Sequence, residues 1–215
     1  MASAARPARS GYVLGALAFA VTSGLLLSSA PASSNGGGPG CGRVVKSSIR
    51  LNHDLLACPA EGLIVGAHGI TIDLNGKVVD GVSFGVGIVN DGFDGVTIRN
   101  GRIQDFDYGI QLNSGARRNH VTRLTISGNE LAGVQLFNAA AKNRITNSII
   151  ELQAGDGVAI IDGSSGNRVV GNTIRNNQNN GVFVQRSSGN RIARNGITGN
   201  SDRNIQLDFH AATRC

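Results

Sequence analysis

The amino-acid sequence predicts an all-β fold in which short parallel strands stack as the coils of a solenoid. Three observations predict it: a repeat of 23 or 24 residues, no helical patterning inside the repeat, and three short apolar runs in each copy. A fixed period of 20 to 50 residues is typical of solenoids and related arrays. The clearest series is formed by GIQL, GVQL, GVAI, GVFV and NIQL, which begin at Gly109, Gly133, Gly157, Gly181 and Asn204.

Two further series run in phase with the first. One contains Ile103, Ile126, Ile150, Ile174 and Ile197, and the other contains Asn119, Asn143, Asn167 and Asn190, each followed within two residues by Val or Ile. Val, Ile, Thr and Asn favour strands and turns, whereas a helical repeat would need Ala, Glu and Lys at helical spacing. The leucine-rich repeat pattern is also absent.

Each repeat supplies three strands and three bends. In RVVGNTIRNNQNNGVFVQRSSGN, residues 168–190, the apolar runs are VV, TI and GVFV. At about 3.3 Å per residue the repeat passes once around a small triangular prism, and successive coils stack about 4.8 Å apart. Val158 and Ile160 are expected to face the core, with Ala159 outside. The Asn series is expected to form a hydrogen-bonded ladder between coils.

The dipeptide Asn-Gly usually signals a hairpin. Here it falls between the aligned series, at Asn75, Asn100, Asn180 and Asn195, so we expect left-handed bends instead.

The first 32 residues have the pattern of a secretory signal peptide. Arg6 and Arg9 precede an apolar stretch from Tyr12 to Ala30, and Ala30 and Ala32 form an A-x-A cleavage site. An uncleaved membrane anchor is the alternative. Residues 33–40, SSNGGGPG, read as a flexible linker. A secreted or extracytoplasmic location by bacterial-type export, with no stable membrane insertion after cleavage, is therefore expected.

Residues 41–61 are predicted to form an N-terminal cap, closed by a Cys41–Cys58 disulfide because these cysteines lie at opposite ends of one short segment. Residues 62–209 are predicted to form about six coils, and residues 210–215 a tail. Two alternatives stay open for this tail: a truncated gene product, or end-to-end self-association through an uncovered last coil. Cys215 has no predicted partner.

Charge and composition limit the classes of molecule that the protein is expected to bind. The formal charge of +6 falls to +4 when Arg6 and Arg9 are removed with residues 1–32, which is compatible with an acidic polysaccharide. Nucleic acid is not expected, because the chain has no Trp, two Tyr, and no basic cluster interleaved with aromatic residues. No metal site or cofactor is expected, and no sequence motif supports a calcium ion.

The segment CGRVVKSSIRLNHDLLACPAEGLIVGAHGITIDLNGKVVDG, followed by N-x-[VI] and G-[VI]-x-[VL] repeats, resembles exported right-handed parallel β-helix repeat proteins. These are related in pattern to NosD-type periplasmic proteins, to carbohydrate-binding and sugar-hydrolase modules, and to pectate-lyase-like solenoids. The resemblance covers essentially the whole mature chain and implies a right-handed parallel β-helix. It does not specify an activity, since the same stack serves lyases, hydrolases, epimerases and proteins without catalysis.

In enzymes with this architecture, the substrate usually lies along the outer face of one stacked sheet. Asp162 and Arg186 are expected to be adjacent across one coil step there, with Asp156 at the start of the same strand. As catalytic candidates, Arg186 could remove a proton beside a uronate carboxylate while Asp162 holds it, or Asp156 and Asp162 could form a glycosidase pair. The alternative is a surface ion pair worth at most about 1 kcal/mol. Candidate ligand contacts are Phe137, Phe183 and Gln185.

Three functions are therefore compatible with the sequence. The first is an exported protein that binds polysaccharide without evident catalysis. The second is a lyase, epimerase or hydrolase acting on acidic glycans. The third is a structural or assembly protein without a glycan ligand.

Overall fold

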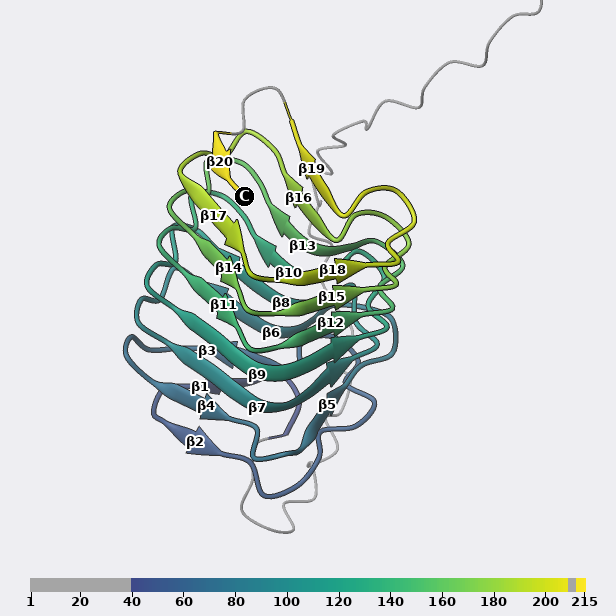
Figure 1. Cartoon of the computed structure of the whole chain (residues 1–215). Helices are drawn as coiled ribbons and strands as arrows, with labels where there is room; N and C mark the ends of the chain where they lie inside the picture. Colours follow the sequence, from purple (N-terminus) through teal and green to yellow (C-terminus); the bar gives the residue numbers. More distant parts are fainter. Residues whose placement is uncertain (1–39, 209–211) are drawn as a thin grey trace, which may run out of the picture. The chain divides into compact units, whose positions relative to one another are not determined.

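The computed structural model describes residues 40–208 and 212–215, and every regular element in these residues is a β-strand. The strands make about seven turns of a parallel solenoid, which confirms the predicted fold (Figure 1). Within the same residues, no helix meets the length and hydropathy needed to cross a membrane. The predicted signal peptide, residues 1–32, and the linker up to residue 39 lie outside the described residues.

One strand from each coil contributes to an eight-stranded parallel sheet. Val158 and Ile160 are fully buried, as predicted. Ala159 faces outward but is only 6% exposed, because it lies between Gln135 and Phe183 on the neighbouring strands. The order of the sheet is β1 (Arg43–Val45), β3 (Leu63–Val65), β6 (Val86–Asp91), β8 (Tyr108–Asn113), β10 (Ala132–Leu136), β13 (Asp156–Ile160), β16 (Val182–Val184) and β19 (Ile205–Leu207).

A twelve-stranded sheet forms the other two sides of the prism, in two arms. The long strands β7 (Thr97–Gln104) and β9 (His120–Ser127) pass through both arms (Figure 1). The first arm also contains β2 (Ile49–Arg50), β4 (Thr71–Asp73), β11 (Arg144–Thr146), β14 (Arg168–Val170), β17 (Asn190–Ala193) and β20 (Thr213–Arg214). The second arm also contains β5 (Val78–Asp80), β12 (Ile149–Glu151), β15 (Thr173–Arg175) and β18 (Gly196–Thr198).

The segment predicted as a cap, residues 41–61, itself follows the path of a coil. β1 pairs with β3, β2 pairs with β4, and Leu55 bridges Val79, so the segment is bonded on all three sides. This extra turn accounts for the difference between the six predicted coils and about seven observed. The predicted Cys41–Cys58 disulfide is present, with a Cα–Cα distance of 5.4 Å. Near the other end, Thr213 and Arg214 in the predicted tail pair with β17.

Buried side-chain amides connect successive coils at all three corners of the prism. The predicted ladder of Asn119, Asn143, Asn167 and Asn190 is confirmed, with each Oδ1 accepting both N–H groups of the previous Asn at 2.9–3.1 Å. Two further ladders were not predicted from the sequence, although their members also repeat every 23 or 24 residues. They contain Ser148, Asn172 and Asn195, and Asn129, Gln153, Asn177 and Asn200.

The Asn-Gly prediction holds at two of its four positions. Asn75 and Asn100 have φ of 52° and 61°, whereas Asn180 and Asn195 are not among the left-handed residues. The side chain of Asn195 belongs to a ladder and that of Asn180 donates to the carboxylate of Asp156. These two asparagines are therefore placed by their amide contacts rather than by a bend.

A column of glycines lets the coils approach one another closely. A Cβ added to Gly157 would lie 2.6 Å from the carbonyl oxygen of Gly181 and 2.6 Å from Cγ2 of Ile174. The same overlap with the next coil recurs at Gly109 and Gly133. The glycine that opens each G-[VI]-x-[VL] motif is therefore required, because a side chain at this position would overlap the next coil.

Substituting Gly157→Ala is expected to lower the free energy of unfolding by about 2–3 kcal/mol, because the methyl group must displace a backbone carbonyl. Urea denaturation checks this. The matched control is Gly196→Ala in β18, where an added Cβ has no heavy atom within 4 Å and φ is not left-handed. A loss at Gly157 no larger than that at Gly196 would contradict the steric argument.

Candidate functional site

An open groove of about 890 Å³ follows the first arm of the twelve-stranded sheet across β9, β11, β14, β17 and β20. Its lining contains the imidazole of His120 and six permanently charged cations, and no acidic residue. The cations are Arg118, Lys142, Arg144, Arg168, Arg191 and Arg214. The groove therefore concentrates positive charge on a single face.

Five of these side chains form a column with one member in each coil. The parallel register pairs His120 with Arg144, Arg144 with Arg168, Arg168 with Arg191, and Arg191 with Arg214. We call this set the basic column. Adjacent strands lie about 4.8 Å apart, so neighbouring rungs of the column begin at that spacing on the backbone.

The alternation of side chains between the two faces of a strand explains why the arginines face outward. Arg144 lies between Asn143, a member of an amide ladder, and Ile145, which is fully buried. The same order, Asn-Arg followed by Ile or Val, recurs at Arg168 and Arg191. The two neighbours are fixed inside the prism, so the residue between them points to solvent.

No carboxylate neutralises these cations in the described part of the chain. The ion pairs found there involve other arginines: Arg99 with Asp73, Arg175 with Glu151, and Arg186 with Asp162. Like charges directly opposite one another in a sheet are destabilising. The basic column therefore places like charges opposite one another on successive strands, with no carboxylate partner among the described residues.

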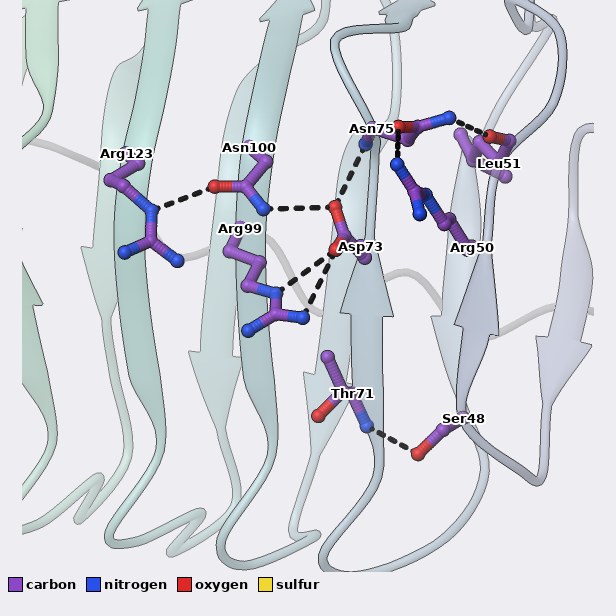
Figure 2. A network of polar contacts seen from close by, with 9 residues as sticks. All are labelled: Ser48, Arg50, Leu51, Thr71, Asp73, Asn75, Arg99, Asn100 and Arg123. Atoms are coloured by element: carbon purple, nitrogen blue, oxygen red, sulfur yellow. Dashed lines mark hydrogen bonds and ion pairs between the residues drawn. The ribbon is translucent and has the colours of Figure 1, made fainter.

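The upstream coils of the same arm show the contrasting arrangement (Figure 2). Asp73 accepts hydrogen bonds from Arg99 and from the amide of Asn100, and Asn100 in turn accepts one from Arg123 at 2.7 Å. Burial tends to raise the pKa of Asp73, but bonds from Asn100, from the backbone of Asn75 and from Arg99 outweigh it, so the pKa is lowered. Here Asp73 pairs with Arg99, and Arg123 bonds to a neutral amide.

His120 forms the first rung of the basic column. Its Nε2 lies 2.8 Å from Oγ1 of Thr146, and this hydroxyl donates to Thr122 at 3.1 Å. The Thr146 oxygen is therefore free to accept the Nε2–H of a neutral imidazole, which leaves Nδ1 to take up a proton. Burial lowers the pKa of His120, and the charges of Arg144 and Arg123 lower it further.

A bound polyanion is expected to reverse the lowering of the His120 pKa by offsetting the charge of Arg144. Since binding would then be coupled to proton uptake, affinity should rise about 2- to 5-fold as the pH falls from about 7.5 to about 5.5, where ligand carboxylates stay ionised. Titration of polygalacturonate at the two pH values measures this. His120→Gln should bind with the same affinity at both, and a pH dependence retained in that variant would contradict the assignment.

A family model described as "Right handed beta helix region" matches residues 51–197. The chain belongs to the right-handed β-helix family. No match was found among curated proteins.

Solved structures show the same β-helix at low identity. A periplasmic alginate epimerase, AlgG, has a TM-score of 0.54 at 15% identity over 75% of this chain and 45% of that one. The A-modules of the Azotobacter vinelandii mannuronan C-5 epimerases AlgE6 and AlgE4 have TM-scores of 0.59 and 0.53. Their identities are 17% and 14%, over 82% and 80% of this chain and 55% and 59% of theirs. The chain thus spans about half the length of these proteins, and the likeness shows the fold.

The predicted catalytic candidates lie outside the groove: Asp156 begins β13 of the eight-stranded sheet, and Asp162 and Arg186 lie two residues beyond the ends of β13 and β16. Arg186 donates a hydrogen bond to Asp162, so the expected adjacency is present. Asp156 accepts bonds from the backbone and side-chain nitrogens of Asn180, and burial raises its pKa. Asp156 is the first residue of β13 and Asp162 lies beyond its last residue, so the length of the strand alone separates them by roughly 13 Å. Glycosidase carboxylates lie about 5–9.5 Å apart, so the geometry does not favour that pair.

The predicted ligand contacts lie on the same sheet. Phe183 is on the outer face of β16, and Phe137 and Gln185 directly follow their strands in one column. All three are half-buried. Their role in binding stays a prediction. In the described residues, no group of three or more His, Cys, Asp or Glu side chains is placed to hold a metal ion.

The basic column was not predicted from the sequence. Four of its rungs lie between a member of the Asn series and the Val or Ile two positions later, in NHV, NRI, NRV and NRI at residues 119–121, 143–145, 167–169 and 190–192. The repeat period therefore places four of the five rungs, and Arg214 lies beyond the series.

Proposed function

We propose that this β-helix protein binds an acidic polysaccharide along the basic column, outside the cytoplasm. The observation that carries the proposal is the in-register stack of His120 and four arginines without counter-ions in the described chain. The titles of the structural neighbours, which name alginate and mannuronan epimerases, support a glycan partner. The Cys41–Cys58 disulfide supports an oxidising compartment.

The length of the groove favours a polymer over a small anion. A phosphate or a single sugar acid would contact one or two rungs, whereas the column continues through five coils. Each unfilled rung would keep its repulsion toward its neighbours. A linear polyanion neutralises all five rungs at once.

The chemistry of the groove favours polysaccharide over nucleic acid. Binding of single-stranded nucleic acid relies on aromatic side chains on which bases stack. Apart from the imidazole of His120, the groove lining has no aromatic ring. Guanidinium groups instead suit carboxylates, to which they donate paired hydrogen bonds.

The groove also favours binding over catalysis. Arginine is a poor base because its pKa exceeds about 12, and the lining has no carboxylate. An alternative activity as lyase, epimerase or hydrolase would have to use the separate face that carries Asp162 and Arg186. Incubation with uronate-containing and neutral polysaccharides tests it: new reducing ends, unsaturated products or epimerised residues would replace binding with catalysis as the function.

Calorimetric titration tests the proposal directly. The protein is expected to bind polygalacturonate and not a neutral glucan, and affinity should fall on the order of 10-fold between about 50 and 200 mM salt as counter-ions compete. The Arg168→Gln variant should bind several-fold more weakly. Arg102→Gln is the matched control, since Arg102 is exposed on the second arm, outside the groove. Absence of binding, or equal losses in both variants, would overturn the proposal.

A further inference from the structure

We infer that the basic column selects its ligand by charge spacing, and that the ligand is a linear polyanion with an acid group on every sugar. The inference rests on the proposed function and goes beyond it, because a merely basic surface would accept any acidic polymer. It follows from how rigidly the positions of the arginines are fixed.

Each central rung is held between two buried anchors. Before Arg168 lies Asn167, which is 1% exposed and bonded to both Asn143 and Asn190 at 2.9–3.1 Å. After Arg168 lies Val169, which is fully buried. A shift of the strand by one residue would expose the aliphatic side chain and break the ladder. The backbone therefore fixes the spacing of the arginine Cα atoms, from which the charges project, at the coil step of about 4.8 Å.

The column has a defined upstream end and a second, shorter row beside it. Thr97 pairs with His120 one coil upstream, so the column begins at His120. In the turns that precede the rungs, Arg118 and Lys142 contribute further cations, whereas the equivalent positions downstream are Gly166 and Gly189. Downstream coils thus present one cation each, and these single rungs set the spacing that the ligand must match.

A chain of 1,4-linked uronic acids meets this requirement. Each ring carries one carboxylate and extends the polymer by a length close to one coil step, so successive carboxylates can meet successive rungs. A polymer with an acid on alternate sugars places its charges two steps apart. It would leave every second arginine without a partner, and the repulsion within the column would persist.

A phosphodiester backbone does not match either. In B-DNA the charges of one strand advance about 3.4 Å per nucleotide along the helix axis while the strand winds around it, so they do not stay in line with five rungs spaced at the coil step. Nucleic acid is thus expected to bind only as strongly as its overall charge provides.

The test compares two oligosaccharides of equal charge and different spacing. Penta-galacturonate and a hyaluronan decasaccharide both carry five carboxylates, on every sugar and on every second sugar. We expect the full-length protein to bind penta-galacturonate at least 10-fold more tightly at the same pH and salt. Affinity should also rise with galacturonate length up to about five units and then level off.

Two variants test whether the preference for penta-galacturonate depends on the basic column. Arg168→Gln, which removes the central rung, should weaken binding of penta-galacturonate about 5- to 10-fold and that of the hyaluronan oligosaccharide less than 3-fold. Arg102→Gln should change neither. Equal affinity of the wild-type protein for the two oligosaccharides would overturn the spacing inference while the proposed function stands. Binding of neither would overturn both.

Discussion

Replacement of Asn167 by alanine is expected to destabilise the protein by about 3–6 kcal/mol. The Asn167 carboxamide is buried and makes four bonds: its Oδ1 accepts the backbone and side-chain N–H groups of Asn143, and its Nδ2 donates to the carbonyl of Ala140 and to Oδ1 of Asn190. Alanine would leave two N–H groups of Asn143 without an acceptor, and each buried unpaired group costs about 1–3 kcal/mol. It would also remove the bonds to Ala140 and Asn190, whose oxygens each keep one other donor. The free energy of unfolding in urea measures the loss.

The matched control for this variant is Asn179→Ala. Asn179 is exposed in a turn, where its recorded hydrogen bonds are two backbone ones, to Gly155 and Asp202. Its replacement should change stability by no more than about 0.5 kcal/mol. Similar losses at the two positions would show that the ladder bonds contribute little beyond those of a solvated amide.

Simultaneous replacement of Arg144, Arg168 and Arg191 by glutamine is expected to weaken polygalacturonate binding about 100-fold. Each arginine contributes one charge contact, and three contacts of about 1 kcal/mol sum to a factor of that size. The same variant should unfold at an equal or higher temperature than the wild type, since it removes repulsion between unpaired like charges.

The control removes the same net charge elsewhere. Arg43, Arg102 and Arg203 are exposed, lie outside the groove, and have no ion pair in the described chain. Their triple replacement by glutamine should reduce affinity less than about 5-fold. If both triple variants lose affinity equally, the interaction depends on net charge and the groove has no special part in it.

The repeat made most of the fold predictable. Val158, Ile160 and the Asn119 to Asn190 series lie where their periodicity places them, because a solenoid repeats the same environment at each coil. The differences between the predicted and the observed fold arose from local sequence context. The segment 41–61 shows little sequence periodicity, yet strand pairing, the Cys41–Cys58 disulfide and buried side chains such as Leu51 hold it as a coil.

The site was harder to predict for a different reason. Apolar and amide positions repeat because the interior requires them, whereas an outward position such as that of Arg168 has no steric requirement, so its repetition is easy to overlook. The adjacency of Asp162 and Arg186 was predictable because one register gives it directly. The absence of acids around the arginines depends on several turns together, which the sequence does not place.

The amide ladders and the glycine column also make the protein extensible. Residues 144–167 contain one complete unit, with a strand for each side, a polar member for each ladder, the close-packed Gly157 and one outward arginine. Each coil contacts only its neighbours, so duplication of this unit inserts a coil without repacking the others. Duplication of these 24 residues in the gene would therefore lengthen the binding surface by one charge. The number of coils thus determines how long a ligand the surface can contact.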